Sequence, residues 1–359
     1  MPARAPEPPG SASSSGIAAR KADHLDLCES DDVGFRSTST LLEGVTLLHQ
    51  SLPELCAEEL STEVELLGRR LRAPVIIAAM TGGHERAASI NRSLAMLAQE
   101  RGLGFGLGSQ RAMQRDPGMD WTYRVRDWAP DILLLGNIGV VQARETGTKD
   151  LDALVRDVGA DALCVHLNPA MELIQSDGDR DFRGCVRTLE RLCGELPFPI
   201  VAKETGNGLS PQTIEKLLGA GVRCVDTSGA GGTSWVGVET LRADEERRSM
   251  GNRLWDWGIP TAASVHYAAR ASLTTIATGG LRSGLDIARA ISLGAHAGGI
   301  ARPVLQTLSR AGEDGVRRYL DELVRELRSV MLLTGSGNVE ELRHAPRVIS
   351  SELERWLSV

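Results

Sequence analysis

The chain has no apolar stretch long enough to cross a bilayer and no closely paired cysteines. A membrane-spanning helix needs about 20 consecutive apolar residues, and no such run occurs among the 359 residues. The six cysteines form no C-x-x-C pair, which argues against a zinc site or a disulfide framework. We therefore expect a reduced, cytoplasmic protein without membrane insertion.

Acidic residues outnumber basic ones, 47 to 40. The formal net charge is -7, so a nucleic-acid partner is not expected, although a local basic pocket remains possible. Lysine is the rarer basic residue, since only four of the 40 Lys and Arg residues are lysines. Lys149 and Lys216 lie in polar, solvated patterns, whereas Lys21 and Lys203 fit a surface role less easily.

Several catalytic signatures are missing. The chain has no H-E-x-x-H, no G-x-S-x-G and no recognisable Cys–His nucleophile pattern, so zinc proteolysis and acyl transfer lack support. It also lacks the spacing of a P-loop and of a G-x-G-x-x-G dinucleotide fingerprint.

The N-terminal segment differs in composition from the rest. Residues 1–19 are rich in Pro, Ala and Ser and lack the apolar core of a signal peptide, so we expect a disordered tail and no export. The remainder, residues 20–359, is expected to form one domain. Arg20, Lys21 and His24 open it as a basic cluster, and spacing alone favours an exposed, solvated helix start.

From residue 74 onward, short apolar runs alternate with amphipathic helical patterns. Eight strand-and-helix units in about 260 residues are typical of an α/β TIM barrel. Residues 233–257 form the largest interruption, and we expect this insertion after the sixth strand to act as a lid. The eight predicted strands lie within residues 74–80, 103–108, 132–139, 162–168, 199–204, 224–229, 273–280 and 296–302.

Unusual polar and glycine residues gather where these apolar runs end. In a TIM barrel the carboxyl ends of the strands carry the active site. The last two ends, TGGLRSG (278–284) and AGGIAR (297–302), are rich in glycine and lead toward helices. Backbone N–H groups at such places bind anions, so a bound phosphate is expected there, although glycine also simply permits tight turns.

Lys203 ends the fifth apolar run. A free ammonium is costly to bury without an anionic partner. Two partners remain open from the sequence: a flavin that is negatively charged when reduced, or a structural ion pair with Glu204 or Asp226.

These motifs together resemble the type 2 isopentenyl diphosphate isomerase family, from about residue 20 to the C-terminus. The motifs that carry the resemblance are RKADH (20–24), HQSLPEL (49–55), MTGG followed by IN (80–91), GSQR (108–111), NIG (137–139), HLNP with Glu172 and GDRDF (166–182), KETGNGLS (203–210), GAGGTSW (229–235), WGIPTA (257–262), ATGGLRSGLDIARA (277–290) and LTGSGNVEEL (333–342).

The resemblance implies an FMN-binding TIM barrel in which NADPH reduces the flavin, Mg2+ is required, and isopentenyl and dimethylallyl diphosphate interconvert without net redox change. It also implies a homotetramer or a larger homo-oligomer. The implied flavin contacts are Met80, Thr81, Gly82, Ser109, Asn137, Lys203, Thr227, Ser228, Gly279, Gly280, Arg282, Ala301 and Arg302. The implied contacts to the prenyl diphosphate substrate are Arg20, Lys21, His24, Arg111, His166 and Asn168, and the implied Mg2+ ligand is Glu172.

Met171 departs from the family pattern, which reads His-x-Asn-Pro-x-Gln-Glu. We place Met171 with His166 and Asn168 in the predicted catalytic group. A thioether cannot donate a hydrogen bond and accepts one only weakly. Besides isopentenyl diphosphate isomerisation, two alternatives therefore stay open: a reduced-flavin isomerase or cyclase for another prenyl or terpenoid substrate, and a flavin-binding homologue without isomerase activity.

Overall fold

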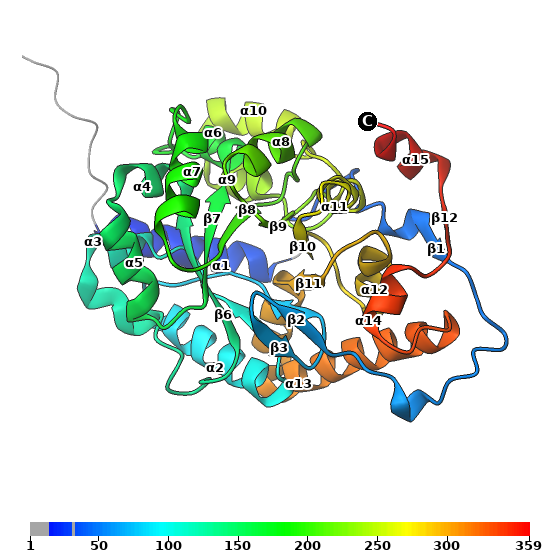
Figure 1. Cartoon of the computed structure of the whole chain (residues 1–359). Helices are drawn as coiled ribbons and strands as arrows, with labels where there is room; N and C mark the ends of the chain where they lie inside the picture. The colour runs from blue at the N-terminus through cyan, green and yellow to red at the C-terminus, as the bar shows by residue number, and fades with distance from the viewer. Residues whose placement is uncertain (1–13, 31–32) are drawn as a thin grey trace, which may run out of the picture.

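Eight short parallel strands pair edge to edge and close into a barrel (Figure 1). The computed structural model describes residues 14–30 and 33–359. The strand order around the barrel follows the chain, and each strand lies inside one of the predicted apolar runs. These strands are β4 (Val75–Ile77), β5 (Gly104–Gly106), β6 (Leu133–Gly139), β7 (Ala162–Leu167), β8 (Ile200–Glu204), β9 (Cys224–Asp226), β10 (Thr274–Thr278) and β11 (Ala297–Ile300).

Helices surround the barrel, and several lie where the amphipathic patterns predicted them. The long helix α13 is interrupted at Gly312, whose φ of 62° is not helical, and it lies beside α2 in Figure 1. The helices between β4 and the end of the barrel are α2 (Glu85–Arg101), α3 (Arg111–Arg115), α4 (Val140–Glu145), α5 (Thr148–Asp157), α6 (Pro169–Ile174), α7 (Cys185–Glu195), α8 (Pro211–Gly219), α9 (Trp235–Arg242), α10 (Glu245–Leu254), α11 (Thr261–Arg270), α12 (Gly284–Ser292) and α13 (Arg302–Leu333).

Helix α12 illustrates how the sequence fixes these boundaries. Ser283 caps its N-terminus by accepting a hydrogen bond from the Asp286 N–H at 3.1 Å, and Asp286 accepts one from the Ser283 N–H at 3.2 Å. This reciprocal pair satisfies backbone donors that the first turn leaves without partners. It also fixes the glycine-rich turn that precedes the helix.

The predicted insertion after the sixth strand contains α9 and α10, and α9 packs against α6 and against the N-terminal helix α1 (Ser14–Glu29). The start of α1 corrects one prediction: residues 14–19 are helical, although their composition predicted disorder. The helix does not depend on its own propensity, because side chains further along α1 bond to the barrel, and most helical stability comes from such packing. Residues 1–13, for which disorder was also predicted, lie outside the described residues.

Two small sheets, which the sequence did not predict, flank the barrel. Strands β1 (Val45–Leu47) and β12 (Arg347–Ile349) pair antiparallel, and β12 lies between α14 (Val339–Arg343) and α15 (Ser351–Leu357). Strands β2 (Val64–Leu66) and β3 (Arg69–Leu71) form a hairpin.

The hairpin closes the amino end of the barrel. Leu66 and Leu71 pack onto side chains that fill the barrel interior, where Cys164, Val201 and Cys224 lie at the same level on three adjacent strands. Because this end is filled, a ligand can enter only from the carboxyl ends of the strands. In the described part of the chain, no helix combines the length and apolarity that a membrane span needs.

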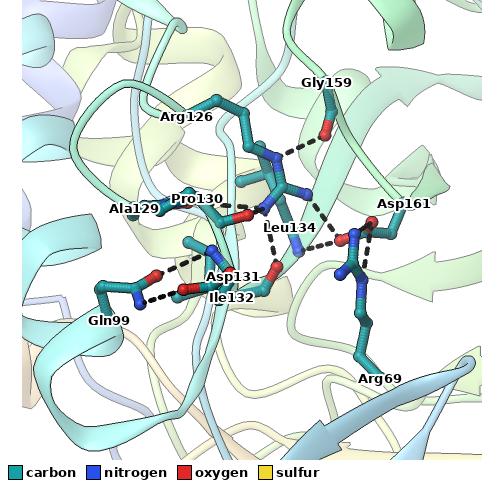
Figure 2. A network of polar contacts seen from close by, with 10 residues as sticks. All are labelled: Arg69, Gln99, Arg126, Ala129, Pro130, Asp131, Ile132, Leu134, Gly159 and Asp161. Atoms are coloured by element: carbon teal, nitrogen blue, oxygen red, sulfur yellow. Dashed lines mark hydrogen bonds and ion pairs between the residues drawn. The ribbon is translucent and has the colours of Figure 1, made fainter.

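Asp161 anchors the hairpin to the barrel, as Figure 2 shows. It accepts hydrogen bonds from Arg69 Nη2 at 2.6 Å, from Arg126 Nη2 at 2.7 Å and from the Leu134 N–H at 2.8 Å. Arg126 in turn donates to the Gly159 carbonyl at 2.7 Å. One carboxylate at the start of β7 therefore joins β3, β6 and the preceding loop.

We predict that Asp161→Ala lowers the free energy of unfolding by about 3 kcal/mol, because both arginines and a backbone N–H lose their acceptor. A urea titration of the purified protein measures this. Asp152→Ala is the matched control: it removes an exposed Arg156–Asp152 pair, and such surface pairs contribute little to stability. Equal effects of the two substitutions would contradict the anchoring role.

Candidate active site

A cavity of about 420 Å3 opens at the carboxyl ends of the barrel strands. Its size is within the usual range for a small-molecule site. The structure brings most of the predicted site residues to this cavity: Arg20, Lys21, His24, Met80, Thr81, Ser109, Arg111, Asn137, His166, Asn168, Met171, Glu172, Lys203, Ser228, Gly279, Gly280, Arg282, Ala301 and Arg302. Gly82 and Thr227 do not line it. Gly82 lies behind Lys21, whose ammonium bonds to its carbonyl, and the Thr227 hydroxyl bonds to the Ile276 carbonyl.

Lys21 fastens helix α1 over the mouth of the barrel. Its ammonium donates to the Gly82 carbonyl at 2.6 Å, to the Ser109 carbonyl at 2.9 Å and to the Tyr123 hydroxyl at 2.9 Å. Burial, together with the nearby charges of Arg20 and Arg111, lowers the pKa of Lys21 to about 7. The solvated helix face favoured by spacing alone is therefore wrong for Lys21, because this face packs against the barrel.

Glu239 of α9 holds the same helix from the other side. It accepts a hydrogen bond from His24 Nε2 at 2.7 Å and pairs with Arg242 at 2.8 Å. Burial alone would raise the pKa of Glu239, but the contacts with His24 and Arg242 hold it below its usual value. With its amide oriented so that the nitrogen faces Glu239, Gln175 donates to Glu239 at 3.2 Å and accepts from Arg20 at 2.8 Å. The insertion and α1 thus form one wall of the cavity.

His166 is held neutral at the end of β7. Its Nδ1 lies 2.9 Å from Asn137 Oδ1, and Asn137 Nδ2 donates to the Leu107 carbonyl at 3.0 Å. Because the Asn137 oxygen must then be the acceptor, His166 Nδ1 carries the proton and Nε2 is an acceptor. Burial, and then the charges of Lys203 and Arg111, lower the pKa of His166 to about 3.

The segment after β7 presents a buried carboxylate. Glu172 accepts hydrogen bonds from Asn168 Nδ2 and from the Asp179 N–H, both at 2.8 Å. Burial raises the pKa of Glu172. Met171 Sδ lies 3.9 Å from Asn168 Nδ2, so this thioether stands beside the amide and borders the cavity.

Glu172 could hold a divalent cation only with help from other ligands. Among residues 14–30 and 33–359, no three His, Cys, Asp or Glu side chains are grouped as a metal site. Mg2+ commonly uses one or two carboxylates together with water and substrate phosphates. The donor set therefore fits a cation that arrives with a diphosphate, and it does not fit a cation held by the protein alone.

Lys203 forms an ion pair and also faces the cavity. Its ammonium lies 2.9 Å from Asp226 Oδ2 and donates to the Glu204 carbonyl at 3.2 Å. Asp226 Oδ1 is buried without a hydrogen-bond partner. Of the partners that the sequence left open for Lys203, the structure contains the ion pair with Asp226. Lys203 is also a lining residue of the cavity, so a bound flavin stays open as a further partner.

The opposite wall of the cavity is built from backbone. Gly279 and Gly280 have φ values of 104° and 82°, which residues with a Cβ rarely adopt. A Cβ at Gly232 would lie 2.4 Å from the Gly280 nitrogen, so the glycines keep backbone groups open to a ligand. Thr278 Oγ1 is buried beside them without a partner. These features fit the phosphate and polar edge of FMN, and Thr278 is a lining residue that was not among the predicted flavin contacts.

Comparison with known proteins identifies the family. The FMN-dependent dehydrogenase family model matches residues 148–349. The isopentenyl-diphosphate delta-isomerase of Methanosarcina mazei is 43% identical over 343 residues, which cover 94% of this chain and 93% of that protein. The isopentenyl-diphosphate delta-isomerase of a Synechococcus species is 46% identical over 336 residues, covering 92% and 96%. The chain belongs to the type 2 isopentenyl-diphosphate delta-isomerase family.

The barrel itself is more widely shared. A mandelate oxidase mutant, solved with a monooxide FMN adduct, matches with a TM-score of 0.64 at 18% identity, covering 90% of this chain and 95% of that one. At this identity the likeness concerns the fold alone.

Sequence reasoning missed several residues of this isomerase-family site. Gln142, Gln175, Trp235 and Thr278 line the cavity, and Glu239 stands behind its wall. Gln142 follows the NIG motif by three residues, and that proximity was the only available signal for it. Trp235 and Thr278 lie within the quoted motifs GAGGTSW and ATGGLRSGLDIARA. Gln175 and Glu239 are brought to the site by contacts between segments far apart in the chain.

We predict that inorganic diphosphate binds with uptake of up to about one proton, measured at a pH about one unit above the pKa of Lys21. In the ligand-free cavity this amine, with its pKa near 7, is then mostly neutral. An anion favours the charged form and raises the pKa. Calorimetry in two buffers with different ionisation enthalpies measures the uptake.

Lys21→Met should abolish this uptake, whereas Lys149→Met, at an exposed position on α5, should leave it unchanged. Because the titration of diphosphate itself is common to all three proteins, the difference reports on Lys21. Equal proton uptake in wild type and Lys21→Met would contradict the assignment.

Proposed function

We propose that this protein interconverts isopentenyl diphosphate and dimethylallyl diphosphate in the cavity at the carboxyl end of the barrel. One observation carries the proposal. Arg20, Lys21 and Arg111 lie close enough for the two arginines to lower the pKa of the lysine, and all three hydrogen bonds of Lys21 go to neutral oxygens. This buried positive charge calls for an anionic ligand.

The remaining walls fit the other parts of the reaction. Leu25, Cys28, Trp235 and Met171 add apolar or aromatic surface to the cavity, suited to a short prenyl chain. The glycine turn after β10 and Lys203 of β8 would hold FMN. Bound and reduced, FMN would supply a site that can give and take a proton beside the alkene. We include NADPH as its reductant and Mg2+ at Glu172, and we propose a homotetramer or larger assembly.

The protein's own groups have three tasks in this isomerisation. Arg20, Lys21, Arg111 and the Mg2+ ligand Glu172 fix the diphosphate, and such positioning can account for roughly 7 to 11 kcal/mol of a barrier. Helices α1 and α9 exclude water from the cationic carbon that forms when the terminal alkene carbon gains a proton. Neutral His166 accepts hydrogen bonds without adding positive charge near that carbon. Loss of a proton from the neighbouring carbon completes the reaction without net redox change.

Met171 supports a second candidate function. Its thioether borders the cavity where the family pattern has an amide, and a polarizable sulfur is well suited to lie against an apolar chain. The same chemistry on a longer prenyl or a terpenoid substrate is therefore the alternative. A flavin-binding protein without turnover is the remaining one.

We expect isopentenyl diphosphate, incubated anaerobically in D2O with the protein, FMN, NADPH and Mg2+, to give deuterated dimethylallyl diphosphate by proton NMR. Unchanged substrate with reduced FMN demonstrably bound would contradict the isomerase proposal. A panel of longer prenyl diphosphates in the same assay would then separate the two alternatives, since turnover of any of them favours a different substrate.

We predict that Lys203→Ala raises the dissociation constant of FMN roughly 10-fold to 100-fold, because a charged hydrogen bond contributes about 1.5 to 3 kcal/mol. Flavin absorbance after gel filtration measures the bound fraction. Lys216→Ala, at an exposed position on α8, is the matched control and should stay as yellow as wild type. A Lys203→Ala protein that retains FMN equally well would remove Lys203 from the cofactor site.

A further inference from the structure

Gln142 of α4 lines the cavity with its side-chain amide, and no residue of α4 was predicted to belong to the site. It lies in the first turn of α4, directly after β6, and its side chain is buried. Gln142 Nε2 donates to Asp179 Oδ2 at 2.8 Å. A Cβ built on Gly139 would lie 2.0 Å from Gln142 Oε1 and 3.0 Å from His166 Nε2. Only glycine at 139 leaves room for the amide to lie beside the histidine.

The hydrogen bonds fix which way this amide points. Because Nε2 donates to Asp179, Oε1 is the atom that faces His166. Since His166 Nδ1 carries its proton toward Asn137, His166 Nε2 is also an acceptor. Two acceptors therefore converge beside Gly139, and a donor such as a water molecule or a protonated phosphate oxygen would satisfy both.

The other end of the amide leads to the predicted metal ligand. Asp179 receives the Gln142 donor on its carboxylate, and its own backbone N–H donates to Glu172 Oε2 at 2.8 Å. Glu172 Oε1 accepts from Asn168 Nδ2. Both oxygens of Glu172 are thus oriented, one by its own helix and one through the chain of contacts that begins at Gln142.

A second residue of α4, Arg144, holds the segment of residues 181–183 without help from Gln142. Arg144 donates to the carbonyls of Asp181 at 2.7 Å and Arg183 at 2.8 Å, so the far end of this acidic segment is fixed independently. Gln142 is the contact from α4 that reaches the end nearest to Glu172. Its loss should therefore release the Asp179 carboxylate, while Arg180, which donates to the carbonyls of Glu172 and Gln175, keeps the neighbouring backbone in place.

We propose that Gln142 is a positioning residue, which holds Asp179 and through it Glu172 in the arrangement that a divalent cation with a diphosphate requires. The inference rests on the proposed function, because that function assigns the cation to Glu172. Residues that orient metal ligands commonly contribute 10-fold to 100-fold in metal affinity. The role differs from a purely structural one, since it predicts a change in cation binding in a protein that keeps its fold and its FMN.

The test uses the FMN-loaded full chain, inorganic diphosphate, and Mn2+ followed by electron paramagnetic resonance. We expect Gln142→Leu to weaken diphosphate-dependent Mn2+ binding about 10-fold to 100-fold and Glu172→Gln to remove it. Gln114→Leu is the matched control: Gln114 bonds to Thr146, just after α4, without reaching Asp179, so its Mn2+ binding should equal that of wild type. Circular dichroism and bound FMN report on folding.

Gln142→Glu is the second variant. It keeps an oxygen toward His166 but sets a carboxylate against Asp179, so it too should weaken Mn2+ binding. Wild-type Mn2+ affinity in either folded variant would overturn the proposal, as would a wild-type protein that binds no Mn2+ with diphosphate. Loss of FMN in both variants would instead show a structural role and overturn it as well.

This experiment separates the two proposals. Mn2+ binding can be measured without turnover. A wild-type protein that binds Mn2+ with diphosphate but does not isomerise isopentenyl diphosphate would contradict the proposed reaction, while the positioning role of Gln142 would stand. If the wild-type protein is an active isomerase and Gln142→Leu binds Mn2+ as wild type does, the proposed reaction stands and the positioning role of Gln142 is contradicted.

Discussion

The site depends on one buried ammonium. Lys21 ties α1 to the loops after β4 and β5 through the carbonyls of Gly82 and Ser109, and among residues 14–30 and 33–359 no carboxylate pairs with its ammonium. Such a group is costly to bury without an anionic partner. An anion bound in the cavity would therefore stabilise the arrangement in which α1 covers the barrel. Arg20 and His24 come from the same helix, one residue before and three residues after Lys21, and the bond from His24 to Glu239 holds this helix from the α9 side.

The barrel could be predicted because its strands are buried on both faces. Such strands appear as uninterrupted apolar runs, and all eight runs contain a barrel strand. The β2–β3 hairpin and the β1–β12 pair carry no comparable pattern, since their strands are only partly buried and the pairing of β1 with β12 joins opposite ends of the chain. The helical start at Ser14 was missed because it is supported by contacts of later residues.

The site was predictable to the extent that it lies at strand ends. His166, Asn137 and Lys203 follow apolar runs, so the fold alone brings them together. The partners that these side chains bond to were not predictable, because they come from segments distant in sequence. Tyr123 bonds to Lys21, Glu239 bonds to His24, and Asp179 bonds to Gln142. Helical spacing reports which face of α1 is polar and not what that face packs against, which explains the error over Lys21.

The cavity has two halves with different physical demands. The half formed by Gly279, Gly280 and Lys203 offers backbone groups and one paired ammonium, which suit a permanently bound phosphate-containing cofactor. The half formed by α1, α9 and the segment after β7 carries the Lys21 ammonium, whose hydrogen bonds go to neutral oxygens. Fold and cofactor chemistry leave the reaction open, so the second half must decide it. In that half, Met171 offers no hydrogen bond to a substrate, and positional control there falls to groups held through networks, such as Glu172.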